Sequence, residues 1–162
     1  MSPQEGYEYG IVDEPGLPML EEALEKYPGL KFIGHSQPFW HEISQDAKPD
    51  LKSRMEWGRG PVREGGRLVC LMRNYKNLYA DLSANSGGCA IMRDEKFGLQ
   101  FLEEFQDRLM FGTDMVNTDM VFPLGEWLDR QYQEGNYLHR PTGKFVLRMP
   151  KRYFSYKRKG EK

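Results

Sequence analysis

The chain has 162 residues, of which 39% are hydrophobic and 29% charged, and its formal net charge is −1. That size and balance fit one globular domain with its own core. They exclude a strong field toward nucleic acid or membranes, and the sequence contains neither a membrane-spanning apolar stretch nor a signal peptide. We therefore expect a cytoplasmic protein with no nucleic-acid and no membrane partner. Cys70 and Cys89 lack metal-ligand spacing, and we expect both to be reduced and at least half-buried.

The chain is expected to begin its regular structure with a helix followed closely by a strand. Apolar side chains recur on one face of residues 18–26, and Pro18 suits the first helical position. Pro28 and Gly29 end this helix. The apolar run over 30–34 predicts a strand directly afterwards.

The middle of the chain predicts a second helix–strand unit behind a long irregular stretch. A short helix is expected over 39–44, after which prolines and glycines interrupt the chain up to residue 65. A helix over 66–74 and a strand over 78–82 follow. Residues 83–88 are small and polar, and they predict a loop.

The last third repeats the pattern, with a helix over 96–105, a strand over 109–111 and a helix over 123–133. Such alternation indicates an α/β fold with parallel strands and right-handed helical crossovers. Three strands leave two edges with unpaired backbone groups. We therefore expect the isolated chain to self-associate through exposed sheet edges.

Two residues with metal-binding or proton-transfer chemistry follow predicted strands. His35 comes at the end of the strand over 30–34, and Asp114 comes shortly after the strand over 109–111. In α/β barrels the chemistry lies at the carboxyl ends of the strands. A histidine there can bind a divalent metal or hold a water, and a carboxylate can act as ligand or proton acceptor. A loop histidine and a helix-capping aspartate are the alternatives; the matched positions strengthen the catalytic interpretation and leave both open.

Other side chains near these strand ends are candidates for binding a substrate. Trp40 follows His35 on the same loop and is the first candidate for stacking on a substrate ring. Asn85 follows the strand over 78–82 and is a candidate for a polar contact. A structural role in a loop remains the alternative for both residues. The arginines able to pair with a substrate carboxylate are Arg59, Arg63 and Arg73.

Three motifs carry a resemblance to a known family. Residues 17–36 read LPMLEEALEKYPGLKFIGHS, residues 77–83 read NLYADLS and residues 101–114 read FLEEFQDRLMFGTD. In this order they resemble the sixth, seventh and eighth strand units of the amidohydrolase-related metal-dependent hydrolases. Those proteins are TIM barrels and include the aminocarboxymuconate-semialdehyde decarboxylase type. The resemblance implies that residues 1–137 form the C-terminal part of a (β/α)8 TIM barrel, about strands six to eight with their helices.

The resemblance also implies a metal site that this chain does not complete. In the family a divalent metal, usually zinc, is held by histidines of the first and fifth strands and an aspartate of the eighth. A sixth-strand histidine lies beside the metal-bound water. By resemblance, Asp114 matches the metal-binding aspartate and His35 the histidine at the metal centre, whereas His41 is expected to lie outside it. Zinc typically takes three or four protein ligands, so we expect the isolated chain to bind zinc weakly or not at all.

Residues 138–162 depart from the family pattern and form a basic tail with interspersed aromatic residues. One interpretation is a solvated tail, and another is a nucleic-acid-binding patch. A third is a shift of reading frame, because codons chosen for residues 138–155 encode a capped amphipathic helix of the family's terminal type when read from their third base.

The function implied by the resemblance is that of an amidohydrolase-like hydrolase acting on a small carboxylated or cyclic substrate, here as a fragment lacking the N-terminal metal ligands. One alternative is a non-oxidative decarboxylase of the same superfamily. The other is an inactive fragment that requires a partner half-barrel. The fold does not distinguish these reactions, because one site design serves all of them.

Overall fold

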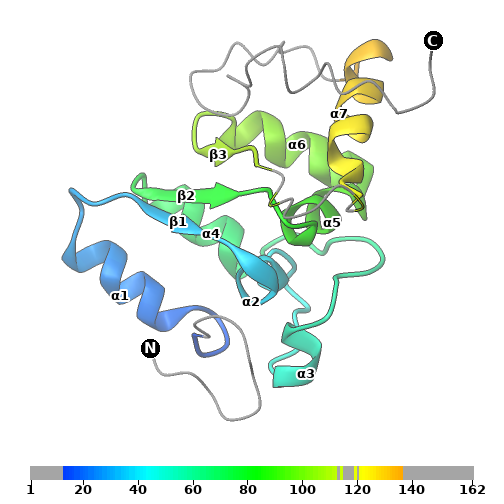
Figure 1. The fold of residues 1–162 in the computed structure, drawn as a ribbon. Coiled ribbons are helices and arrows are strands. Elements are labelled where there is room, and N and C mark those ends of the chain that lie inside the picture. Colours follow the sequence, from blue (N-terminus) through cyan, green and yellow to red (C-terminus); the bar gives the residue numbers. More distant parts are fainter. Residues whose placement is uncertain (1–12, 113, 115–118, 120, 137–162) are drawn as a thin grey trace.

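The computed structural model describes residues 13–112, 114, 119 and 121–136, and it has a mixed α/β fold (Figure 1). Helices and strands alternate through most of this part of the chain, as the sequence predicts. In chain order the elements are α1 (Pro18–Lys26), β1 (Phe32–Gly34), α2 (Ser36–His41), α3 (Leu51–Arg54), α4 (Arg67–Asn74), β2 (Leu78–Asp81), α5 (Ser86–Met92), α6 (Glu95–Phe105), β3 (Leu109–Met110) and α7 (Pro123–Gln133).

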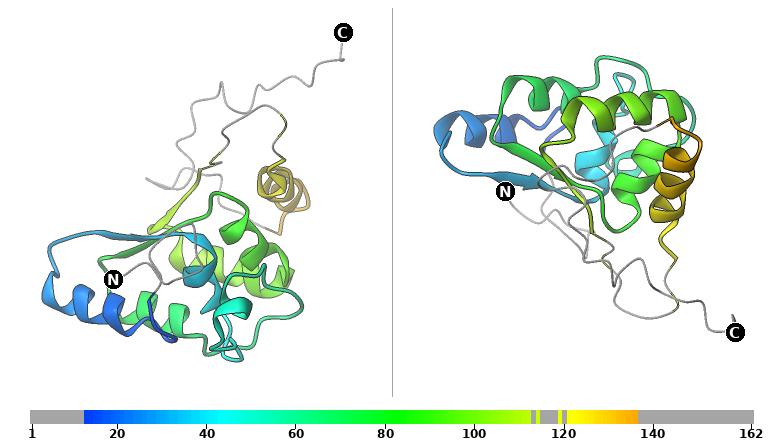
Figure 2. Two further views of the ribbon diagram at one scale, coloured as in Figure 1. Left: turned by 60° about the horizontal axis from the view of Figure 1, so that its bottom comes forward. Right: turned by 90° about the horizontal axis from the view of Figure 1, so that it is seen from above.

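The three strands form a parallel sheet in the order β1-β2-β3, so the predicted parallel arrangement is confirmed. Ile33 pairs with Tyr79, and Asp81 pairs with Met110. The two views of Figure 2 show α1, α4 and α6 gathered on one side of this sheet. Side chains that point to that side, such as Leu78, are buried, whereas Ile33 on the other face is 54% exposed.

The hydrophobic core lies between the sheet and its helices. α4 contributes one apolar face to it, and aromatic residues of α2 and α6 fill the space beside it. Packed aromatic rings bury large areas and are a major source of core stability. The largest fully buried side chains are Phe105, Leu24, Ile43, Leu68, Leu71, Met72, Leu78, Leu82, Ile91, Leu102, Leu109 and Leu124.

Several boundaries differ from those predicted. α2 begins at Ser36 rather than 39, and β1 and β3 are shorter than the apolar runs that predicted them. The predicted loop over 83–88 is wrong in its second half, because α5 begins at Ser86. Gly87 and Gly88 are buried there, so tertiary packing overrides their low helix propensity.

α3 is a short helix that the sequence analysis did not predict. The carboxylate of Asp50 accepts a hydrogen bond from the backbone N–H of Ser53 at 2.9 Å, which is the usual contact of an N-cap residue. Arg54, at the end of α3, is buried beside Glu42 and donates to the carbonyl of Glu14. The short helix therefore joins the irregular stretch to the start of the described chain.

Further expectations concern the cysteines, membrane spans and the tail. Cys70 and Cys89 are unpaired and half-buried, as expected. Among the described helices, none combines the length and apolar character that crossing a bilayer requires. The basic tail over 138–162 lies outside the described residues.

Candidate functional site

His35 follows β1 directly and shares a sheet face with Ile33, because alternate residues of a strand point to the same side. The chain turns sharply there: Ser36 has φ of 72°, and α2 begins at that residue. Gly34 permits α2 to pack this close to the end of the strand, since a Cβ at its position would meet the ring of Phe39 at 2.1 Å. The close approach of α2 to the strand end therefore determines where the imidazole lies.

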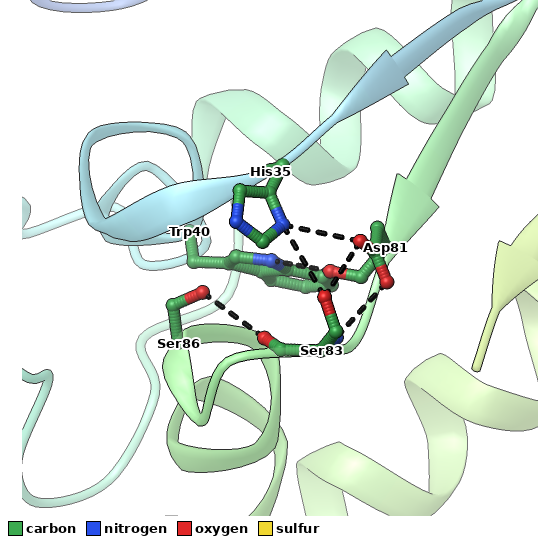
Figure 3. Close-up of polar contacts among 5 residues, drawn as sticks. All are labelled: His35, Trp40, Asp81, Ser83 and Ser86. Atoms are coloured by element: carbon green, nitrogen blue, oxygen red, sulfur yellow. Dashed lines mark hydrogen bonds and ion pairs between the residues drawn. The ribbon is translucent and has the colours of Figure 1, made fainter. Parts of the chain in front are cut away.

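The imidazole of His35 meets a carboxylate from the neighbouring strand (Figure 3). Nδ1 of His35 lies 3.1 Å from Oδ2 of Asp81, the last residue of β2. The parallel register explains the contact, because Ile33 pairs with Tyr79 and each partner lies two residues further along its strand. The side chains are about one third and one quarter exposed, at 32% and 25% respectively, so the pair is accessible to solvent on one side.

Asp81 is held from several directions. Its Oδ1 accepts the backbone N–H of Ser83 at 3.0 Å, and its Oδ2 accepts the hydroxyl of Ser83 at 2.7 Å. The indole N–H of Trp40 donates to the backbone carbonyl of Asp81 at 2.9 Å. The two contacts from Ser83 orient the carboxylate, and the contact from Trp40 joins the backbone of Asp81 to α2.

The arrangement differs from that of a nucleophilic serine triad. In such a triad the histidine lies between the carboxylate and the serine, and uses one ring nitrogen for each. Here Ser83 Oγ lies 3.5 Å from Nδ1 of His35, on the same nitrogen that faces Asp81. Ser83 thus supports the carboxylate and is not activated by the opposite ring nitrogen.

The end of β3 comes close to the same place. A Cβ at Gly112 would lie 3.2 Å from Cβ of Ser83 and 3.6 Å from Oδ1 of Asp81. Two residues later Asp114 has φ of 51°, in the left-handed region, and is exposed. No hydrogen bond or ion pair joins Asp114 to His35 in the described part of the chain. The predicted pair therefore follows two strands, β1 and β3, of one parallel sheet.

The described residues do not fit a complete zinc site. No group of three or more histidine, cysteine, aspartate or glutamate side chains is placed among them to hold a metal ion. His35 and Asp114 supply at most two donors, fewer than zinc usually takes from a protein. Both oxygens of Asp81 already accept hydrogen bonds. Within the described part of the chain, the contacts of the imidazole are made by Nδ1, whereas Nε2 lies on the side of the ring away from Asp81 (Figure 3).

The structure places the two predicted substrate-binding residues in supporting positions. Trp40 is 3% exposed, and its ring packs edge-on against Phe39 and Phe101. The indole is thus mostly enclosed by other side chains, and stacking of Trp40 on a substrate ring stays a prediction. The amide of Asn85 donates to the carbonyl of Val121 at 3.1 Å, which ties the loop after β2 to the segment before α7.

His41 lies at the end of α2, where Nε2 is 2.9 Å from the carbonyl oxygen of Lys48. Among the candidate arginines, Arg63 pairs with Asp46 and Arg73 pairs with Glu104. These two side chains are therefore engaged on the surface.

Arg93 is an arginine that sequence reasoning did not select. It lines a small cavity between α2 and α5, whose wall also includes Trp40 and Ser86. Burial lowers the pKa of its guanidinium, although Asp46 and Asp94 act in the opposite direction. Its Nε is buried and has no hydrogen-bond partner among the described residues. Arg93 is thus a half-buried cation with one N–H that has no partner among the described residues.

Asp81 and Ser83 are the site residues that sequence analysis missed. The signal was present, because Asp81 stands two residues after Tyr79 at the end of a predicted strand. The chain matches no family model, no curated protein and no solved structure in the comparisons made.

Proposed function

We propose that the chain is the C-terminal part of an amidohydrolase-like (β/α)8 barrel and contributes His35 and Asp114 to a metal-dependent hydrolytic site. The main observation in support is that His35, Asp81 and the segment leading to Asp114 lie at one edge of a sheet of three consecutive parallel strands. In α/β barrels this edge carries the chemistry. The remaining metal ligands would come from barrel strands outside this chain.

Within the site, the residues of this chain would have different tasks. Nε2 of His35 would accept or return a proton at the reacting group, since Nδ1 already faces Asp81. The exposed carboxylate of Asp114 would bind metal or take up a proton. A small carboxylated or cyclic substrate is the class that the resemblance of the three motifs implies.

Sequencing the gene and its flanking DNA tests the barrel assignment. The expected result is an adjoining sequence that encodes the missing strands, with a His-x-His motif on the first and a histidine on the fifth. An adjoining sequence without these features would contradict the proposal.

The chemistry is then tested on the longer protein in which this chain is joined to the strands encoded by the adjoining sequence, called here the rejoined protein. With Zn²⁺ supplied, we expect hydrolysis of small esters, amides or lactones, and a loss of roughly 10²–10⁴-fold in kcat for His35→Gln. His41→Gln is the matched control, because His41 contacts the Lys48 carbonyl, and it should retain activity. Release of CO₂ from a carboxylic acid without hydrolysis would instead establish the decarboxylase alternative. Activity unaffected by His35→Gln and Asp114→Asn would refute the assigned roles.

A further inference from the structure

The role proposed for Nε2 requires that His35 carry its hydrogen on Nδ1 when the imidazole is neutral. A neutral imidazole has one N–H donor and one bare nitrogen acceptor, and its neighbours decide between the two tautomers. In this structure the decisive neighbours are Asp81 and Ser83, whose oxygens both lie on the Nδ1 side.

We infer that Asp81 is a positioning residue that holds His35 in the Nδ1–H tautomer and presents Nε2 as a bare acceptor at the strand edge. An ionised carboxylate only accepts hydrogen bonds. The 3.1 Å contact from Nδ1 to Oδ2 is therefore attractive only if Nδ1 carries the hydrogen. With a bare Nδ1, two lone pairs would face each other across that distance.

The hydroxyl of Ser83 supports the same tautomer. It has one hydrogen, and Oδ2 of Asp81 is the nearer acceptor at 2.7 Å, whereas Nδ1 of His35 is 3.5 Å away. The hydroxyl therefore donates to the carboxylate, and its lone pairs face the Nδ1–H. The backbone N–H of Ser83 occupies the other carboxylate oxygen, so Asp81 cannot rotate away without losing both contacts.

The backbone also holds this arrangement. Trp40, which lies on the helix that follows His35, donates to the carbonyl of Asp81 and connects α2 to the end of β2. Gly87 permits the close packing, since a Cβ there would meet Cα of Leu82 at 2.6 Å and the indole of Trp40 at 3.0 Å. Thus α2, which follows His35, is in direct contact with the end of β2, which carries Asp81.

The inference deepens the proposed function and rests on it for the role of Nε2 in catalysis. Carboxylate or carbonyl partners of this kind orient histidines at metal and proton-transfer sites, and their loss typically costs about 10–100-fold in affinity or activity. We expect a loss of that size in kcat for Asp81→Asn in the rejoined protein. In Asp81→Asn the backbone N–H of Ser83 keeps the amide oxygen at the Oδ1 position, so the N–H₂ group faces Nδ1 and reverses the preference that the carboxylate imposes.

The test is long-range ¹H–¹⁵N NMR of the full 162-residue chain, which reports the tautomer of each neutral imidazole without any activity. His35→Gln identifies the signal. We expect Nδ1–H at His35 in the unmodified chain, a shift toward Nε2–H in Asp81→Asn, and retention of Nδ1–H in Ser83→Ala, the matched control.

An Nε2–H tautomer in the unmodified chain would overturn the inference, and that measurement holds even if Asp81→Asn fails to fold. A folded Asp81→Asn variant with an unchanged His35 signal would overturn it as well. An inactive rejoined protein with His35 in the Nδ1–H form would contradict only the proposed function.

Discussion

Arg108 illustrates, at the scale of one side chain, how the fold holds a charge in an apolar interior. It is 4% exposed, and its guanidinium donates to the backbone carbonyls of Met72, Tyr75 and Leu78, at the end of α4 and the start of β2. Buried carbonyls left without donors cost free energy. The side chain therefore satisfies the backbone where the chain passes from helix to strand.

Arg108→Met should lower the free energy of unfolding by about 1–3 kcal/mol, because the apolar stem is kept while the buried carbonyls of Met72 and Leu78 lose the guanidinium donor. Denaturant unfolding measures the change. Arg73→Met is the control: Arg73 pairs with Glu104 on the surface, and such pairs contribute less than about 1 kcal/mol. Equal losses in the two variants would contradict the role assigned to Arg108.

Tyr75 predicts a pH dependence at the alkaline end. Its hydroxyl donates to Glu25 at 2.6 Å and lies 3.2 Å from a carboxylate oxygen of Glu21, and these neighbours raise the pKa of Tyr75 from 10.0 to about 12, with Glu25 the main cause. The folded state thus holds this proton more tightly than the unfolded state. Its contribution to stability is complete below pH 10 and is lost as the pH rises through about 12.

Denaturant unfolding of the chain and of Tyr75→Phe between pH 8 and about 12 measures that contribution. The stability difference between them should shrink as the pH rises through this range. Glu25→Gln should lower the pH at which the loss occurs, because it removes the negative charge beside the phenol. A difference that stays constant across the range would show that the folded state does not hold the proton more tightly.

At the scale of elements, two helical glycines allow the effect of close packing to be distinguished from the effect of helix propensity. Gly98 lies in α6, where a Cβ would meet the carbonyl oxygen of Ile91 in α5 at 2.3 Å. Gly125 lies in α7, where a Cβ would meet nothing within 4 Å. Gly98 is therefore required by the contact between two helices, whereas Gly125 is not.

Gly98→Ala should destabilise the fold by about 1–3 kcal/mol, because α6 has to move away from α5. Gly125→Ala should stabilise it by up to about 1 kcal/mol, because alanine restricts the unfolded chain and favours helix. Thermal unfolding of both variants measures the opposite signs. Stabilisation by Gly98→Ala would mean that the two helices are not packed as closely as this structure shows.

The same distinction decides which elements are predictable from the sequence. α1 and α7 have the predicted bounds, since each begins with a proline at the first helical positions and carries an apolar stripe. α5 is not predicted from the sequence. Its glycines, Gly87 and Gly88, have low helix propensity, and they are helical where they pack closely against other elements. Local sequence signals suffice for the first kind of element, and the second depends on tertiary contacts.

The site divides in the same way. His35 is recognisable because it directly follows an apolar run. The role of Asp81 depends on the pairing of Ile33 with Tyr79, and a shift of one residue would turn the carboxylate to the opposite face. The sequence predicts that Trp40 stacks on a substrate ring because it follows His35 on the same loop, whereas its burial against Phe101 of α6 depends on tertiary packing.

At the scale of the whole molecule, the described sheet has helices on one side and two edge strands, β1 and β3. Ile33, on the face without described helices, is 54% exposed, and Leu30, which precedes β1, is 58% exposed. An edge strand with apolar neighbours can pair with another chain. We therefore expect the 162-residue chain to self-associate through β1.

Sedimentation velocity over a range of protein concentrations measures this association. Ile33→Lys should shift the chain toward monomer, because a charge beside an edge strand opposes pairing with a second strand. Val121→Lys is the matched control, since Val121 is 75% exposed but lies before α7, outside the sheet. If Val121→Lys dissociates the assembly and Ile33→Lys does not, the contact lies elsewhere. If the unmodified chain stays monomeric throughout, the edge of β1 does not drive association, and the expected self-association is wrong.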